Sequence, residues 1–309
     1  MTPPQSILGP LFGLGAALFW GGGDFGGGMG VKRLGSTVRG ALLVVLIGHL
    51  LSFCVVAPLA HAAGDAFPAG LPLYWGLAGG AVAALSLMAF YIALSDGHMG
   101  SAAALSGLLC AAVPAIVSAF TEGAPGAPRI AGFLLAAIAI WRIAAPPAAE
   151  KNADPLFEPG DIDQLAAHRS SLLALVGGLG FGFYFVSLKY AATSGVLWPL
   201  ASSRIGSVTT SAVLLMGLFV FGEKSAPQQP RLALRTVAWI AGGATLDTCG
   251  NLLYIAATRL GRLDVAAVIA SLYPASTILL AAWVLRERTT RRQITGMLLA
   301  LPAVVLITL

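Results

Sequence analysis

Three polar residues share one face of an apolar segment near residue 250. Asp247, Asn251 and Tyr254 are separated by four and three residues, so on a helix their side chains lie on a single side. A carboxylate inside a membrane span is costly and calls for a partner or a polar environment. The sequence therefore predicts either a seam of structural hydrogen bonds or one wall of an interior cavity.

A second carboxylate, Asp24, lies about two-thirds of the way along the first apolar segment, after Trp20 and a run of three glycines. It could bind a cation, a proton or a substrate amine, or it could lie near the membrane interface beside Lys32 or Arg33. Each glycine weakens a helix by about 1 kcal/mol relative to alanine, so we expect this segment to be bent or locally loosened.

Further candidates come from the second half of the chain. Arg204 could bind a carboxylate or phosphate of a solute, or it could extend to the membrane interface. Tyr273 precedes a proline, which predicts a helix kink flanked by Ser271 and other hydroxyl groups. The complete set of expected substrate contacts is Trp20, Asp24, Tyr91, Tyr184, Arg204, Asp247, Asn251, Tyr254, Ser271 and Tyr273.

Other ionisable residues have simpler interpretations. His49 lies within an apolar segment and is either a hydrogen-bonded packing residue or a proton relay. Lys189 is expected to anchor its helix at the interface. Glu122 and Glu287 are expected to cap helix ends and to pair with nearby arginines.

These residues belong to ten long apolar segments. Only 10% of the residues are charged, whereas a soluble domain has roughly 25% charged residues. The mean hydropathy is +0.85. A helix of about 20 apolar residues crosses a ~30 Å hydrocarbon core, and alternating strands are absent from the pattern. We therefore predict an all-α polytopic membrane protein. The segments are 7–30, 38–60, 71–94, 101–120, 130–146, 171–193, 199–221, 235–257, 264–285 and 293–309.

The segments divide into two sets of five, predicted as repeats over residues 7–146 and 171–309, joined by a hydrophilic linker at 147–170. Local patterns recur, as in Tyr91-Ile92-Ala93 and Tyr254-Ile255-Ala256. Because five is odd, successive repeats enter the bilayer from opposite sides, which predicts an inverted repeat. Asp247, Asn251 and Tyr254 form a polar stripe along one helix face. Only its tyrosine has a counterpart in the first half, which favours an asymmetric cavity.

Composition also indicates what is absent. The net charge of +5 comes from residues at segment ends, so no nucleic-acid partner is expected. Cys54, Cys110 and Cys249 form neither a disulfide framework nor a zinc motif. No catalytic or nucleotide-binding motif appears, so we expect no enzyme activity and no cofactor.

Charge asymmetry bears on orientation. Thirteen lysines and arginines lie in the odd connections and five in the even ones, which places the odd connections in the cytoplasm and both termini outside.

Several stretches resemble EamA-type transporters of the drug/metabolite transporter superfamily: Leu18–Phe25, Tyr254–Gly261, Ser271–Pro274 and Leu285–Arg288 with Gly296. The resemblance covers essentially the whole chain except the linker. It implies ten helices in two inverted repeats that export or exchange small metabolites such as amino acids, with or without proton coupling. It also implies cytoplasmic termini, contrary to the charge asymmetry.

The resulting hypothesis is a secondary transporter with a midplane cavity lined by segments 7–30, 71–94, 171–193 and 235–257. We expect a multi-pass protein of a bacterial inner membrane, able to act as a monomer, with the lipid bilayer and a small-molecule substrate as its partners. The alternatives are a membrane-embedded enzyme and a partner protein that moves no solute.

Overall fold

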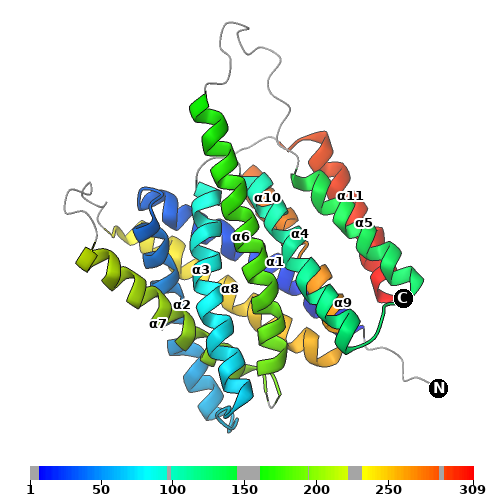
Figure 1. Ribbon diagram of the computed structural model, residues 1–309, viewed down its shortest axis with the longest axis horizontal. Helices are drawn as coiled ribbons and strands as arrows, with labels where there is room; N and C mark the ends of the chain where they lie inside the picture. The colour runs from blue at the N-terminus through cyan, green and yellow to red at the C-terminus, as the bar shows by residue number, and fades with distance from the viewer. Residues whose placement is uncertain (1–6, 96–98, 145–160, 194, 222–231, 285–288) are drawn as a thin grey trace, which may run out of the picture.

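In a computed structural model the chain folds into a bundle of helices (Figure 1). The structure describes residues 7–95, 99–144, 161–193, 195–221, 232–284 and 289–309, and no strand occurs among them. The helices of the first half are α1 (Leu8–Arg33), α2 (Val38–Ala62), α3 (Leu71–Ser95), α4 (Met99–Thr121) and α5 (Ala127–Ala144). Those of the second half are α6 (Asp161–Ala191), α7 (Leu197–Phe221), α8 (Leu234–Leu260), α9 (Leu263–Ala270), α10 (Tyr273–Val284) and α11 (Arg291–Thr308).

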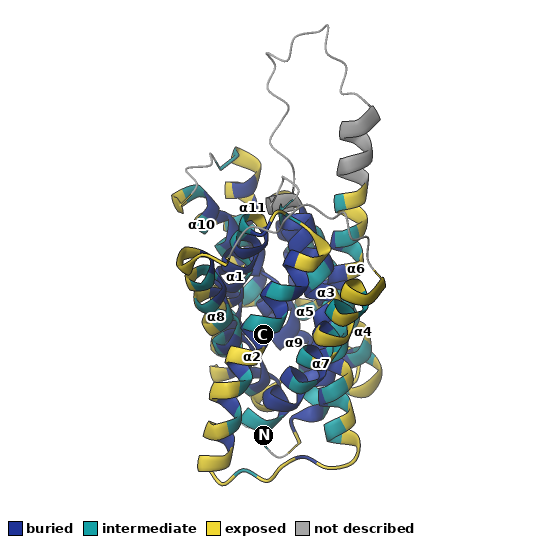
Figure 2. Ribbon diagram, turned by 90° about the vertical axis from the view of Figure 1, so that its left-hand side faces the viewer, coloured by how far each residue is buried: buried dark blue, intermediate teal, exposed yellow. Residues whose placement is uncertain are grey.

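Many large apolar side chains are exposed on the outside of the bundle, while polar groups are buried inside, which is the pattern of a membrane protein. Figure 2 shows the buried residues along the inner faces of the helices. Phe219 is 82% exposed and Trp283 is 80% exposed, whereas Arg204 is 1% exposed. Such large apolar side chains face hydrocarbon at no cost, while the polar groups find partners inside. The prediction of an all-helical polytopic membrane protein is confirmed in outline.

By length and composition, six helical stretches of the described residues could cross a membrane: α2, α3, α6 from Arg169, α7, α9 with α10, and α11. The sequence predicted ten spans. The long helices α1 and α8 fall outside the six because they combine many glycines or charged residues with their apolar ones. In both helices the acidic residue, Asp24 or Asp247, borders an interior cavity and not the lipid face.

The most extensive helix pairings follow a similar pattern when the two halves are exchanged. Counting α9 and α10 as one, each helix of the first half corresponds to the helix five places later. The extensive contact of α1 with α8 then corresponds to that of α6 with α3, and α2–α7 and α5–α11 correspond to themselves. Figure 1 shows α5 beside α11, with the start of α1 and the end of α11 at the same end of the bundle.

Three local expectations need correction. Helix α6 begins at Asp161, inside the expected linker. The ninth apolar segment is not one kinked helix, because α9 ends at Ala270 and α10 begins at Tyr273. Pro274 is therefore the second residue of a new helix, where its missing N–H breaks no helical hydrogen bond.

The third correction concerns the glycine run, because α1 is continuous from Leu8 to Arg33. Its glycines allow close packing instead of loosening the helix. A Cβ atom on Gly26 would lie 2.8 Å from the Cα of Gly243 on α8, and one on Gly27 would overlap the ring of Tyr91. The absence of side chains at these positions lets α1 pack directly on α8 and α3.

Candidate functional site

A buried ion pair joins α7 to α8 at the centre of the bundle. Nη2 of Arg204 donates to Oδ2 of Asp247 at 2.5 Å. The other guanidinium nitrogens donate to α2, with Nε 3.0 Å from Oγ of Ser52 and Nη1 2.9 Å from Nε2 of His49. Arg204 is thus held inside the protein, and the expectation that it extends to the membrane interface is wrong.

His49 is a hydrogen-bonded packing residue between α2 and α7. An arginine can only donate, so Nε2 of His49 must accept from Arg204 and carry no proton. The proton then resides on Nδ1, which donates to Oγ of Ser207 at 2.5 Å. This tautomer makes the ring a neutral support for the guanidinium.

The polar stripe on α8 divides into two environments. Asn251 is buried, donates through Nδ2 to Oδ1 of Asp247 at 3.1 Å, and accepts from the Tyr184 hydroxyl at 2.9 Å. Tyr254 is fully buried against Phe185, with ring centroids 4.4 Å apart. Asn251 and Tyr254 therefore belong to a structural seam, and only Asp247 of the stripe borders open space.

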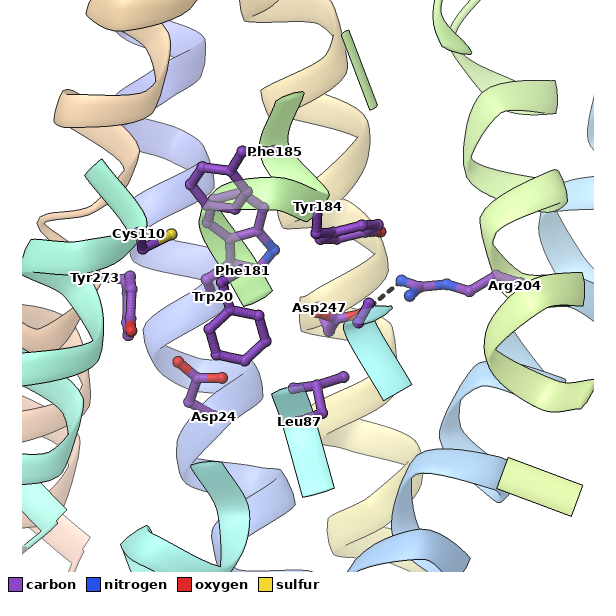
Figure 3. Close-up of a pocket in the computed structure, with 11 residues that line it drawn as sticks. Trp20, Asp24, Leu87, Cys110, Phe181, Tyr184, Phe185, Arg204, Asp247 and Tyr273 are labelled. Atoms are coloured by element: carbon purple, nitrogen blue, oxygen red, sulfur yellow. Dashed lines mark hydrogen bonds and ion pairs between the residues drawn. The ribbon is translucent and has the colours of Figure 1, made fainter. Parts of the chain in front are cut away.

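That space is a central cavity of about 40 Å³, counted as room for the centres of water molecules (Figure 3). Such a volume holds a few waters and is smaller than a metabolite, so a substrate requires the cavity to expand. Its lining combines charged, aromatic and apolar side chains from both halves of the chain. They are Trp20, Asp24, Ala83, Leu87, Cys110, Phe181, Tyr184, Phe185, Arg204, Asp247 and Tyr273.

Asp24 lines this cavity from α1. In Figure 3 its carboxylate is directed toward the side where Tyr273, Trp20 and Phe181 lie. No hydrogen bond or ion pair links it to another residue in the described part of the chain, so the alternative of pairing with Lys32 or Arg33 finds no support. Asp24 and Asp247 thus border the same cavity in opposite states, one without a cation and one paired with Arg204.

A smaller cavity of about 20 Å³ lies beyond Leu87 and Asp247, which line both spaces. Tyr91 and His49 border this second cavity and not the first. Tyr273 lines the first cavity, but Ser271 lies buried without lining it. Of the ten expected contacts, the structure brings six to the central cavity: Trp20, Asp24, Tyr184, Arg204, Asp247 and Tyr273.

Comparison with known proteins identifies the family of the second half of the chain. Residues 168–309 match the model of the EamA-like transporter family. This region is an EamA-like transporter domain. The family belongs to the drug/metabolite transporter superfamily, so this domain is of a membrane transporter family. The resemblance expected from the sequence is confirmed for residues 168–309.

The fold also matches solved structures along its whole length. One of them, described as "Crystal structure of protein", superposes with a TM-score of 0.66 at 17% sequence identity, covering 97% of this chain and 98% of the other. At this identity the match establishes the fold alone. No curated protein matches the chain.

A second polar cluster lies at the end of the bundle where α1 begins and α11 ends. Glu122 at the end of α4 pairs with Lys189 of α6 and accepts from the backbone N–H of Leu263 at 3.0 Å. Lys189 is thus an ion-pair partner of another helix, which corrects its reading as an interface anchor. Glu287 lies outside the described residues.

The same cluster includes Arg262, which directly precedes α9, and Asp264, which lies in the first turn of α9. Asp264 is fully buried and accepts from Nη2 of Arg262 at 2.8 Å, and Arg262 also donates to the carbonyl oxygens of Glu122 and Gly123. The hydrogen bonds to Asp264 raise the pKa of Arg262 above its ordinary value, so the guanidinium stays charged. The cluster ties α4, α6 and α9 together.

Sequence reasoning missed part of the lining of the central cavity, including Phe181 and Phe185. These two residues lie on the same side of α6 as Tyr184, which was expected, and that aromatic pattern at helical spacing could have identified them. Leu87 and Cys110 carry no comparable signal, because one apolar residue in an apolar span resembles any other.

Proposed function

We propose that the protein is a secondary transporter that exports or exchanges small metabolites such as amino acids, and that the central cavity is its substrate site. The observation that carries this proposal is the origin of the lining. Trp20, Asp24 and Leu87 come from the first half, and Tyr184, Arg204 and Asp247 come from the second. A movement of one half against the other would therefore enlarge the cavity or open it to one side.

The proposed mechanism is alternating access by two inverted five-helix repeats. The helix pairing supports it, because the contacts of α1 with α8 have their counterpart in those of α6 with α3. Repeats related in this way can rock about a fixed midplane site, exposing it first to one side of the membrane and then to the other. The domain limits proposed are those expected from the sequence, with the start of α6 moved to Asp161.

The proposal includes coupling and location. Asp24 faces the cavity and can take up a proton when a substrate leaves, which would couple transport to a proton gradient. A bacterial inner membrane supplies such a gradient, and the two fused repeats form a complete cavity within one chain, so a monomer suffices. An enzymatic role is not proposed, since the family is a transporter family.

Counterflow in proteoliposomes tests the function. Vesicles loaded with a mixture of unlabelled amino acids are diluted into labelled ones, with and without an imposed pH gradient. We expect protein-dependent accumulation that Asp24→Asn lowers by roughly tenfold or more, equivalent to about 1.4 kcal/mol. Asp65→Asn removes a carboxylate from a loop outside the cavity and should retain full flux.

Three results would each contradict a part of the proposal. Accumulation no greater than in protein-free vesicles would rule out amino acids as substrates. Flux that Asp24→Asn leaves intact would remove the central cavity as the site. Equal flux with and without the pH gradient would eliminate the proton coupling alone.

A further inference from the structure

We infer that a pocket at one end of the bundle binds the phosphate group of an anionic phospholipid, with the guanidinium groups of Arg129 and Arg262 as its donors. This surface pocket has a volume of about 390 Å³, against about 40 Å³ for the central cavity. It shares no lining residue with the central cavity among the described residues, so the inference does not depend on the proposed transport.

The surface pocket lies where several helices begin or end. Ile7 directly precedes α1, Arg129 lies in the first turn of α5, and Arg262 directly precedes α9. Leu260 is the last residue of α8, and Ile307 lies in the last turn of α11. Figure 1 shows the start of α5 and the end of α11 at this end of the bundle. Helix ends of a membrane protein reach the polar headgroup region, so the pocket lies at the depth of lipid phosphates.

The charges of the lining favour an anion. The described lining residues include two arginines and no aspartate or glutamate. Asp264, which pairs with Arg262 at 2.8 Å, is fully buried and does not line the pocket. A guanidinium group presents N–H donors in a planar arrangement that matches the oxygens of a phosphate, and basic pockets between membrane helices are suited to anionic headgroups.

Arg262 is held in position by the protein itself. Nε and Nη2 donate to the carboxylate of Asp264, Nη2 also donates to the carbonyl oxygen of Gly123, and Nη1 donates to the carbonyl oxygen of Glu122 at 2.9 Å. Nη1 carries two hydrogens, and the second has no partner among the described residues. The side chain is 22% exposed. Arg262 can therefore donate to a ligand oxygen without giving up its protein contacts, and little side-chain freedom is lost on binding.

The apolar part of the pocket distinguishes a lipid from a soluble phosphate ester. Ile7 is exposed, and so is Leu11, one turn further along α1. On α5, Leu134 is exposed just beyond the turn that holds Arg129. The other apolar lining residues used here are Leu260, Val265 and Ile307. Acyl chains attached to a bound phosphate would cover this apolar surface, which a soluble phosphate ester would leave uncovered.

The headgroup attached to the phosphate matters as well. A choline headgroup would bring a quaternary ammonium close to the two arginines, and like charges repel. A glycerol headgroup carries no charge and leaves the phosphate as the only ion. An anionic lipid should therefore bind more tightly than a zwitterionic lipid with the same chains.

Lipid titrations followed by native mass spectrometry test the inference on the full chain purified in detergent. The probes are phosphatidylglycerol, phosphatidylcholine with the same acyl chains, and glycerol phosphate, which has no chains. We expect phosphatidylglycerol to bind at least about fivefold more tightly than phosphatidylcholine and at least about tenfold more tightly than glycerol phosphate. This order is measured on the unmodified protein, so it does not depend on the folding of a variant.

Substitutions then assign the lipid to the surface pocket. Arg129→Gln should weaken phosphatidylglycerol by roughly fivefold, whereas Arg129→Lys keeps the charge and should lose about twofold or less. Arg259 lies in the last turn of α8, is exposed at the same end of the bundle and does not line the pocket. Arg259→Gln is therefore a matched control and should bind phosphatidylglycerol as the unmodified protein does.

Four results would overturn the inference. Equal affinities for the two lipids would remove the role of charge. Glycerol phosphate binding as tightly as phosphatidylglycerol would assign the pocket to a soluble phosphate ester. Full affinity for phosphatidylglycerol in Arg129→Gln would place the lipid elsewhere. An equal loss in Arg129→Gln and Arg259→Gln would show a general attraction to basic residues at this end of the bundle.

Discussion

Arg204 and Asp247 join α7 to α8 through the bundle interior, with 2.5 Å between Nη2 and Oδ2. The arginine side chain is almost fully buried, and the aspartate keeps a small exposure to the cavities. Bulk water does not solvate either charge when its partner is removed. The pair therefore behaves as a unit, held in place by Ser52 and His49 on one side and by Asn251 on the other.

We expect Asp247→Asn to destabilise the protein by roughly 3 kcal/mol, the low end for a broken buried pair because Asp247 retains some exposure. The double variant Arg204→Met with Asp247→Asn should recover much of that loss, since no uncompensated charge remains. Thermal unfolding of the single variants Asp247→Asn and Arg204→Met and of the double variant in detergent gives the coupling free energy. Additive losses would mean that the two side chains do not depend on each other.

Close helix packing makes a second prediction. A Cβ atom on Gly206 of α7 would overlap the backbone of Leu77 on α3, whereas one on Gly217 of the same helix meets nothing within 4 Å. Gly206→Ala should cost about 1–3 kcal/mol through overpacking. Gly217→Ala should be neutral or stabilise by up to about 1 kcal/mol through helix propensity. Similar melting temperatures for the two variants would contradict this packing of α3 on α7.

The cluster at the end of α4 makes a third prediction. Asp264 is fully buried and binds both Arg262 and the backbone N–H of Val265, at 2.8 Å in each case. Asp264→Asn should lower the stability by roughly 1–3 kcal/mol, because the buried site loses its charged acceptor. Asp65→Asn serves as a matched control in unfolding experiments. A loss no larger than that of the control would show that Arg262 is satisfied without Asp264.

Orientation can be predicted from the distribution of charge. Lysines and arginines gather at the end of the bundle that carries the α5–α6 connection. Among them are Lys32, Arg33, Arg142 and Arg169. At the opposite end, Lys189 and Arg262 are already paired with acidic residues. The positive-inside rule then places the α5–α6 end in the cytoplasm and both termini outside.

Reporter fusions at the C-terminus measure this directly. Alkaline phosphatase should be active there and green fluorescent protein dark. The opposite pair of signals would support the cytoplasmic termini that the family resemblance implies.

The sequence was sufficient for the class of fold and for part of the lining of the candidate site. Long apolar segments identify membrane helices, and the spacing of Asp247 and Asn251 identifies an inward face. The partner of Asp247 was not predictable, because Arg204 lies 43 residues away and only packing of α7 on α2 and α8 brings it there. The sequence also could not show that Asn251 and Tyr254 are buried in structural contacts while Asp247 lines the cavity. That difference depends on the neighbours of Asn251 and Tyr254 on another helix.

The glycine run of α1 shows a different difficulty. From the sequence, Gly26 and Gly27 indicated a weak helix, since intrinsic propensity is all that one segment reveals. In the structure these two glycines allow close packing against Gly243 and Tyr91, which are far along the chain. Propensity was overridden by tertiary contact.

The two interior cavities have a common wall in Leu87 and Asp247. A solute passing between the two spaces would have to displace these two side chains and part the ion pair of Asp247 with Arg204. Substitutions at Leu87 are therefore expected to change how freely the two cavities communicate.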